Sequence, residues 1–444
     1  MRGHLTRSLA RSAHAPEYYT GFLLLAVAGS LALGAAIQNT DITALSFVLL
    51  TYVLAFRFVR GKTPSVALAI ILCITVYHLA AYVNSNIFDL PGTRPDSETF
   101  HEYALAKAQK GNIRISVEYK LYTNLLGALY YFFGTSYYLA SVFSVLALTV
   151  GLSVLMAILQ EMGVHRHQGL VILLCGLLPS TIIIGSSPMR EAFQLLVLQI
   201  MVLMVLLMAK HGSIRYFIFA LAGASVFGLL HKGMLFAALI ITFLLWLFWV
   251  GKNVKLKNYK QVWVGGLVFG GIVVSGLWII FGTQPGIDLV MGLVRKDPMW
   301  TIWHYRYAID NLGQPNTAYD IVFEYGTIWE GIWSLFKVYV YYLFYPIYFQ
   351  GAFSPKEIYA VLESWLRLGL FGVILYHIRW ITPRLEERDY LLLVLYLLMT
   401  MVWSLGTTNY GQAIRHHILS NWLLIVLAAG CFTMPGSKVN TNNT

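Results

Sequence analysis

The chain has 444 residues, of which 58% are hydrophobic and only 11% are charged. Soluble domains contain about 25% charged residues, so this composition excludes a soluble protein. The net charge of +11 would suggest a nucleic-acid partner in a soluble chain. Here the Lys and Arg residues lie in short loops between apolar runs, so we expect no nucleic acid.

Apolar runs of about 20 residues, the length that crosses a bilayer as a helix, recur along the whole chain. We predict about twelve transmembrane helices in a single polytopic membrane domain over 1–444, and therefore an all-α integral membrane protein. The predicted spans lie at 20–37, 43–59, 65–84, 137–159, 168–185, 190–210, 214–230, 232–250, 261–282, 359–380, 389–405 and 417–434.

Two long connections interrupt these spans, at 85–136 and 283–358. Each contains a short aromatic stretch, 119–134 in the first and 331–349 in the second. Lys337 in the middle of the second stretch favours a helix lying in the membrane interface over a helix that crosses. We interpret both stretches as interfacial helices, and a crossing at 331–349 is the alternative.

The distribution of Lys and Arg predicts the orientation, because these residues are enriched in cytoplasmic loops. With the N-terminus inside, more than half of the 31 basic residues fall in cytoplasmic loops and tails. The acidic residues crowd into the two outer connections instead. We therefore predict that both termini are cytoplasmic and that polar chemistry takes place on the outer face.

The first candidate site is the sequence RPDSETFHEY, which starts the predicted helix after the third span. Asp96 is either an N-cap, with Thr99 at the third helical position, or a general base at the mouth of a membrane cavity. Glu98, His101 and Glu102 have the spacing of one helix face. That face is either solvated or binds a divalent metal.

Charged residues at the outer ends of spans form the second candidate site. Arg190 and Glu191 follow a proline at the start of a span. They either pair with neighbours, or Arg190 binds phosphate through its two-pronged guanidinium. His231 and Lys232 lie between two spans, at the same predicted outer level of the membrane as Arg190. They either bind phosphate, or Lys232 simply extends its charged end to the membrane interface.

Two further groups of cations lie on the predicted outer side. Arg306 is surrounded by Trp, His and Tyr residues, which suits a contact with sugar or phosphate, while an aromatic belt at the interface is the alternative. Arg415, His416 and His417 begin the last predicted span. Histidine can bind phosphate or donate a proton near neutral pH, so we predict a functional role here.

Other sequence features restrict the kind of chemistry. Glu363 and Arg367 lie one turn apart within a predicted span, and we interpret them as a structural ion pair. The chain has no Walker loop and no GxGxxG, HExxH or GxSxG motif. This argues against an ATP-driven pump, a soluble-nucleotide enzyme, a zinc protease and an α/β-hydrolase.

Four places in the sequence form a pattern. They are Asp96 with Phe100, His101 and Ala104, FFGTS at 132–136, SSPMRE at 186–191, and Arg415 to His417. In these places the chain resembles the type-C integral-membrane glycosyltransferases, whose relatives include the bacterial O-antigen and exopolysaccharide polymerases. In such enzymes the acid often follows the first span, whereas here it follows the third.

The resemblance implies sugar transfer from a polyprenyl-phosphate- or diphosphate-linked donor at the outer face of a bacterial plasma membrane. Asp96 would be the base, supported by Glu98, His101 and Glu191. It implies no cofactor, and its partners are the lipid-linked sugar, the bilayer and other polysaccharide-assembly proteins. Phosphate would be bound by Arg190, His231, Lys232, Arg306, Arg415, His416 and His417.

The rival class is a flippase or transporter of lipid-linked oligosaccharide. Such transporters show inverted repeats, with broken spans at matching positions. We find no matching pair in the sequence, and the charges cluster at the outer face and not at mid-membrane. We further expect the enzyme to bring Arg190, Arg306 and Arg415 together at one phosphate site.

Overall fold

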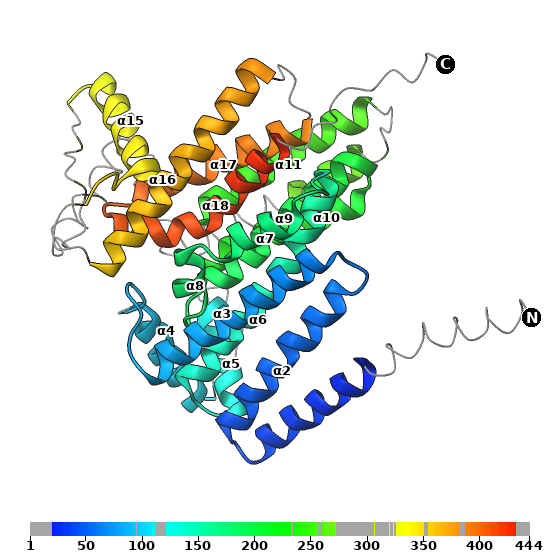
Figure 1. Cartoon of the computed structure of the whole chain (residues 1–444). Helices are drawn as coiled ribbons and strands as arrows, with labels where there is room; N and C mark the ends of the chain where they lie inside the picture. Colours follow the sequence, from blue (N-terminus) through cyan, green and yellow to red (C-terminus); the bar gives the residue numbers. More distant parts are fainter. Residues whose placement is uncertain are drawn as a thin grey trace, which may run out of the picture. The chain divides into compact units, whose positions relative to one another are not determined.

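The protein is built from helices (Figure 1). No β-strand runs through the residues that its structure, a computed structural model, describes. The predicted all-α class is therefore confirmed for this part of the chain. The described residues are 20–94, 96–111, 121–231, 234–255, 260, 262–267, 269–271, 306, 319, 323, 326–349, 354–381 and 387–431.

A first apolar helix covers Thr20–Ala36. The elements that follow it are α2 (Thr40–Val59), α3 (Pro64–Asn86), α4 (Asp96–Gln109), α5 (Leu121–Phe133), α6 (Tyr137–Glu161), α7 (Gln168–Gly176), α8 (Pro179–Gly185), α9 (Glu191–His211), α10 (Ile214–Leu230), α11 (Met234–Lys255), α15 (Ile328–Phe344), α16 (Pro355–Tyr376), η1 (His377–Ile381), α17 (Glu387–Gly406) and α18 (Tyr410–Cys431).

Seven of the described helices are long and apolar enough to cross a membrane, or eight if α7 and α8 together count as one span. The protein thus has the helices of a multi-pass membrane protein, while the number twelve stays a prediction. Shorter apolar helices occupy much of the remaining predicted spans, at Thr20–Ala36, Ile214–Leu230, Ile240–Gly251 and Val262–Gly271.

The predicted span 168–185 is not one straight helix. It consists of α7 and α8, which are bent by 56° relative to each other. Pro179 starts α8, and proline has no amide hydrogen and disfavours a helical conformation of the residue before it. The hydropathy of this run predicts a span, but the proline divides it.

Contacts divide the chain into two compact units. Unit 1 comprises Met1–Ser153, Ile172–Leu177 and Thr181–Leu196, and unit 2 comprises Val154–Val171, Leu178–Ser180 and Val197–Thr444. In unit 1, α2 packs on α3 and α4 packs on α5. In unit 2, α10 packs on α11, and helices α15 to α18 pack on one another.

The two aromatic stretches predicted to lie in the interface are both helical. In unit 1, α5 has 13 residues, which is too short to cross a bilayer. In unit 2, α15 begins with a capping box between Thr327 and Glu330. Whether α15 lies in the interface or crosses the membrane stays a prediction, since its 17 residues are near the lower limit for a crossing.

Three predicted cytoplasmic ends meet in unit 2. Lys210, at the end of α9, forms an ion pair with Glu161 at the end of α6, at 2.9 Å. Arg388, at the start of α17, donates a hydrogen bond of 2.8 Å to the Glu161 carbonyl oxygen. The predicted topology requires these three ends to lie on one side of the membrane, and their contacts agree with that. Which side it is stays a prediction.

Candidate functional site

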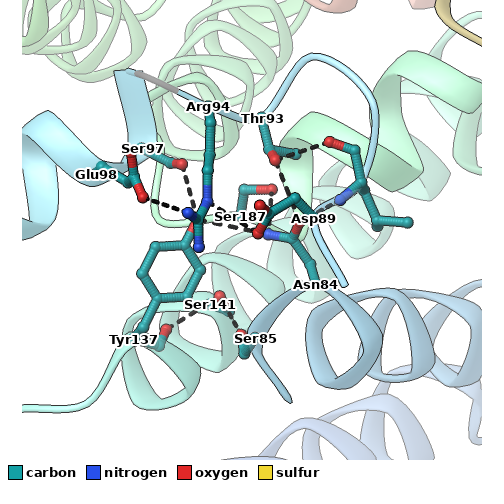
Figure 2. Close-up of polar contacts among 11 residues, drawn as sticks. Asn84, Ser85, Asp89, Thr93, Arg94, Ser97, Glu98, Tyr137, Ser141 and Ser187 are labelled. Carbon is teal, nitrogen blue, oxygen red and sulfur yellow. Dashed lines mark hydrogen bonds and ion pairs between the residues drawn. The ribbon is translucent and has the colours of Figure 1, made fainter. Parts of the chain in front are cut away.

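The connection between α3 and α4 is held by one buried asparagine at the end of α3 (Figure 2). The side-chain oxygen of Asn84, Oδ1, accepts hydrogen bonds from the Leu90 backbone amide at 2.8 Å and the Thr93 hydroxyl at 3.1 Å. Its amide donates to the Ser187 hydroxyl at 3.3 Å and to the Tyr137 hydroxyl at 3.5 Å. Asn84 therefore joins this connection to α6 and to the turn before α9.

The start of α4 is fixed by further polar contacts, also drawn in Figure 2. The Tyr137 hydroxyl donates to the Ser97 hydroxyl at 2.7 Å. The Arg94 guanidinium lies between two carboxylates, 2.8 Å from Asp89 and 2.6 Å from Glu98. These ion pairs are about half exposed, so they add little stability, but they set the direction of the Arg94 and Glu98 side chains.

Asp96 is the first residue of α4, and its side chain is exposed. The prediction of an N-cap at Asp96 is thus wrong by one residue, because the helix already includes it. A carboxylate in the first turn is still favoured by the helix dipole. Asp96 is exposed, and its role as a general base stays a prediction.

His101 is half-buried and faces the aromatic residues of α5 and α6. Its Nδ1 atom lies 2.6 Å from the Tyr130 hydroxyl, and its ring packs edge-on against Tyr130 and Tyr137. Burial lowers the pKa of His101, and the carboxylates of Glu102 and Glu98 oppose this shift. The imidazole is therefore biased towards its neutral form.

The predicted metal-binding face does not form a ligand cluster in the described residues. Glu98 points to Arg94 and His101 to Tyr130, so two of the three candidate ligands have other partners. Within the described ranges, no group of three His, Cys, Asp or Glu side chains is placed to hold a metal. The alternative of a divalent metal stays a prediction.

The structure brings Arg190 to α4. The Arg190 guanidinium carbon lies 5.3 Å from the centre of the Phe100 ring, within the range of a cation–π interaction. Phe100 lies one turn after Asp96, and residues four apart project from the same side of a helix. Glu191 is the first residue of α9 and is buried. We call Asp96, Glu98, Phe100, His101 and Arg190 the α4 site.

In unit 2, two of the predicted histidines each pack against Trp403, near the end of α17. The His416 ring stacks on Trp403 at 3.6 Å between ring centres, and its Nδ1 atom lies 2.9 Å from the Thr407 hydroxyl. The His231 ring packs edge-on against the same Trp403 at 5.0 Å. These residues are far apart in sequence, and their juxtaposition follows from the packing around Trp403.

Arg306 lies at the same helix end and is buried. Its Nη1 atom donates to the carbonyl oxygens of Ser404 at 3.2 Å and Thr407 at 3.0 Å. The last carbonyl groups of a helix lack intrahelical partners and attract cations. Arg306 therefore caps α17, which is a role that the sequence did not predict.

The predicted start of the last span is wrong by several residues. Helix α18 begins at Tyr410, so Arg415, His416 and His417 lie within its second turn and not at its entry. The polar residues before 417 lower the hydropathy, although many of them are buried between helices. His417 is fully buried and faces α15, where its Nε2 atom donates to the Tyr342 carbonyl oxygen at 2.8 Å.

Glu363 and Arg367 form the predicted pair within α16, with a separation of 4.0 Å. Both side chains are almost fully buried. Glu363 also accepts hydrogen bonds from the Ser180 amide at the start of α8, at 2.8 Å, and from the Asn421 amide of α18, at 3.2 Å. The pair is thus confirmed, and the sequence missed its second role as a partner of the broken helix.

The candidate residues are divided between the two units. Arg190 belongs to unit 1, whereas Arg306 and Arg415 belong to unit 2, so a phosphate site shared by the three arginines stays a prediction. Lys232 lies outside the described residues. No family model, curated protein or solved structure matches the chain.

Proposed function

We propose that the protein is a membrane glycosyltransferase of the type-C kind, which uses a polyprenyl-phosphate- or diphosphate-linked sugar in the synthesis of a cell-surface polysaccharide. One observation supports this proposal most: an exposed carboxylate, Asp96, starts α4, and the guanidinium of Arg190 lies over the ring of Phe100, which follows Asp96 by four residues. These are the two groups that transfer from a lipid phosphate requires. The reaction takes place at the outer face of a bacterial plasma membrane.

The chemical step is a displacement at the anomeric carbon of the sugar. The acceptor hydroxyl oxygen forms the new bond to this carbon, and its proton passes to the Asp96 carboxylate. The bond between the anomeric carbon and the phosphate oxygen breaks, and its electron pair leaves with the phosphate. Arg190 stabilises the charge that grows on this oxygen, which is commonly the largest contribution to catalysis.

The cations of unit 2 have a binding role in this proposal. Arg306, Arg415 and the histidines at 231 and 416 would hold further phosphate or sugar oxygens, with Trp403 as an aromatic surface. Because cationic side chains neutralise the phosphate, we expect transfer to persist in a chelator. Loss of transfer in EDTA, restored by magnesium or manganese, would instead make Asp96, Glu98 and His101 candidate ligands.

The decisive variant is Asp96→Asn, tested in cells that lack the chromosomal copy. Asparagine has the shape of aspartate but cannot take the proton, and losing a negative charge at the start of a helix costs only about 0.3–1 kcal/mol. We therefore expect normal membrane levels and a loss of surface polysaccharide. Removal of a general base typically lowers the rate by ~10²–10⁴. The matched control is Asp41→Asn, an exposed acid in the first turn of α2, which should leave the polysaccharide unchanged. Normal polysaccharide with Asp96→Asn would exclude Asp96 as the base.

A second candidate function is transport of a lipid-linked oligosaccharide, and the broken helix pair α7–α8 favours it. Substrate sites of transporters are often built from discontinuous helices. The two candidates differ in their products, because a transferase forms a new glycosidic bond and a transporter moves its substrate unchanged. Incubation of purified protein in vesicles with lipid-linked sugar, followed by analysis of linkages, distinguishes them.

A further inference from the structure

The imidazole ring of His101 is held at its Nδ1 atom by Tyr130. Nδ1 lies 2.6 Å from the Tyr130 hydroxyl oxygen, and among the described residues this is the one hydrogen bond that either side chain makes. The ring also packs edge-on against Tyr130 and Tyr137, at 5.3 and 5.6 Å between ring centres. All three residues belong to unit 1. These contacts fix the orientation of the His101 ring.

The burial of Tyr130 decides which group donates in this contact. Its side chain is only 2% exposed, and a buried hydroxyl proton needs an acceptor. A phenol can donate or accept. If Nδ1 donated, the Tyr130 proton would have no acceptor among the described residues. If Tyr130 donates, its proton and the Nδ1 lone pair are both satisfied. Tyr130 is therefore the donor, and the neutral His101 ring carries its own proton on Nε2.

The neutral form of His101 is favoured at this position. Burial lowers the pKa of His101 below its ordinary value of 6.5, and the carboxylates of Glu102 and Glu98 oppose this shift. A protonated ring would donate through Nδ1 and would deprive the Tyr130 proton of its acceptor. The ring is half-buried, and Nε2 lies at its tip, beyond the Tyr130 contact. His101 thus presents an uncharged N–H group with a fixed direction.

The charges near this N–H group favour an uncharged ligand over a phosphate. Arg94 is paired with Asp89 at 2.8 Å and with Glu98 at 2.6 Å (Figure 2). Glu102 follows His101 directly in α4. Three carboxylates and one guanidinium leave an excess of negative charge, which repels an anion. The hydroxyl groups of a sugar, in contrast, can accept from an N–H group and donate to a carboxylate.

The cation of the α4 site lies beside a different residue of the helix. Arg190 contacts Phe100, whose ring packs on Tyr122, whereas His101 packs on Tyr130. Neighbouring residues of a helix point in directions about 100° apart. Helix α4 therefore presents a guanidinium on the side of Phe100 and a neutral donor among carboxylates on the side of His101.

We propose that His101 donates a hydrogen bond through Nε2 to a hydroxyl group of the acceptor sugar, and that Tyr130 is the residue that positions it. This inference rests on the proposed function. Arg190 binds the phosphate of the lipid-linked donor, and His101 binds the acceptor. The hydroxyl that His101 holds is not the one that loses its proton to Asp96, so His101 contributes to binding of the acceptor and not to the displacement itself.

The first test measures the tautomer of His101 and needs no substrate. Full-length protein with isotope-labelled histidine is studied in nanodiscs by NMR of the imidazole nitrogens, at a pH above about 8, where an ordinary histidine is neutral. His101→Gln identifies the His101 signals by difference. We expect the proton on Nε2, and Tyr130→Phe should shift the Nδ1 signal because Nδ1 loses its hydrogen bond. A proton on Nδ1 would overturn the proposal.

The second test measures transfer from the lipid-linked sugar to oligosaccharide fragments of the cell's own surface polysaccharide. His101→Leu removes the donor, whereas the side-chain amide of His101→Gln still places an N–H group near the position of Nε2. A hydrogen bond between neutral groups corresponds to about threefold to tenfold in binding. We expect His101→Leu to raise KM for the fragments by this factor and His101→Gln to restore most of it. KM for the lipid-linked donor and kcat should stay unchanged.

The matched controls are two tyrosine variants of α5. Tyr130→Phe keeps the ring beside His101 but removes its anchor, so KM for the fragments should rise. Tyr131 is 48% exposed and its ring contacts Phe132, so Tyr131→Phe should change neither KM nor the NMR signals of His101. If His101→Leu does not fold, Tyr130→Phe provides the kinetic test.

The outcomes separate this inference from the proposed function. Suppose that the wild type transfers sugar and Asp96→Asn does not. A wild-type KM for the fragments in His101→Leu, or equal impairment of His101→Leu and His101→Gln, then overturns the role of His101 and leaves the proposed function intact. If the wild type transfers no sugar, the proposed function fails and the sugar-binding role of His101 fails with it.

Discussion

Replacement of Asn84 by leucine tests whether the connection before α4 is held in the way described. Leucine has a similar size and suits the end of an apolar helix, so the variant should still enter the membrane. It removes the acceptor of the Leu90 amide at 2.8 Å and of the Thr93 hydroxyl at 3.1 Å. It also removes two longer contacts of 3.3 and 3.5 Å.

The magnitude follows from these contacts. Each of the two shorter hydrogen bonds contributes about 0.5–1.5 kcal/mol, and a backbone amide left without a partner adds about 1 kcal/mol. The longer contacts to Ser187 and Tyr137 are weaker, so the total is about 2–4 kcal/mol. Since about 1.4 kcal/mol corresponds to a factor of ten, local opening should become about 30- to 1000-fold more frequent.

Hydrogen exchange measured by mass spectrometry reports this opening directly, because the Leu90 amide is one of the groups released. We expect faster exchange in a peptide covering 87–94 and unchanged exchange in α6. The matched control is Asn86→Leu. Asn86 is exposed, and its side-chain amide donates to the Tyr82 carbonyl oxygen of its own helix, so the effect should be below about 0.5 kcal/mol.

Two outcomes would refute the reasoning. Unchanged exchange over 87–94 in folded Asn84→Leu protein would mean that other contacts hold the connection. Equal effects of Asn84→Leu and Asn86→Leu would mean that the change is not specific to the buried amide. If the exchange rises as expected, the proposed function further predicts weaker sugar transfer, since Asp96 follows this connection.

The remaining predictions concern single side chains. The pKa of His101 is lower in the folded state than its ordinary value of 6.5. The stability that comes from its neutral form is therefore complete above about pH 6.5 and is lost as the pH falls towards the folded-state pKa. His101→Gln should flatten this dependence of the unfolding midpoint on acid pH. Glu363→Gln leaves the Arg367 charge buried without its counter-charge, which should cost about 3–5 kcal/mol and reduce the monodisperse fraction in size-exclusion chromatography. Lys210→Ala breaks an exposed pair with Glu161, so it should change stability by less than about 1 kcal/mol, and a large drop in the unfolding midpoint would contradict this.

Hydropathy predicted the positions of the helices more accurately than their breaks and their first residues. The spans at 43–59, 65–84 and 137–159 correspond closely to α2, α3 and α6. The break at Pro179 and the early start of α18 were missed for related reasons. Both depend on polar groups that other helices satisfy, as Glu363 does for the Ser180 amide, and such contacts are not visible in a local window of sequence.

The sequence pointed to Asp96 as an acid at the start of a helix and to Arg190 as a cation at the start of a span. In the structure Asp96 starts α4 and Arg190 contacts Phe100 on that helix, while the site itself stays a prediction. Asn84 was missed because the candidates were charged residues and histidines, and Asn84 is uncharged. A polar residue at the end of an apolar run is nevertheless a signal in the sequence.

The hydrogen bonds that join α3, α6 and α4 run in a single direction. The Asn84 amide donates to the Tyr137 hydroxyl, which donates in turn to Ser97. Phenylalanine at 137 would leave the Asn84 amide with Ser187 as its acceptor and would remove the donor to the Ser97 hydroxyl. Substitutions at these positions are therefore coupled. Among homologous sequences, we expect an apolar residue at 137 to occur together with changes at 84 and 97. Covariation at these three positions would then reflect which group donates and which accepts at each hydrogen bond.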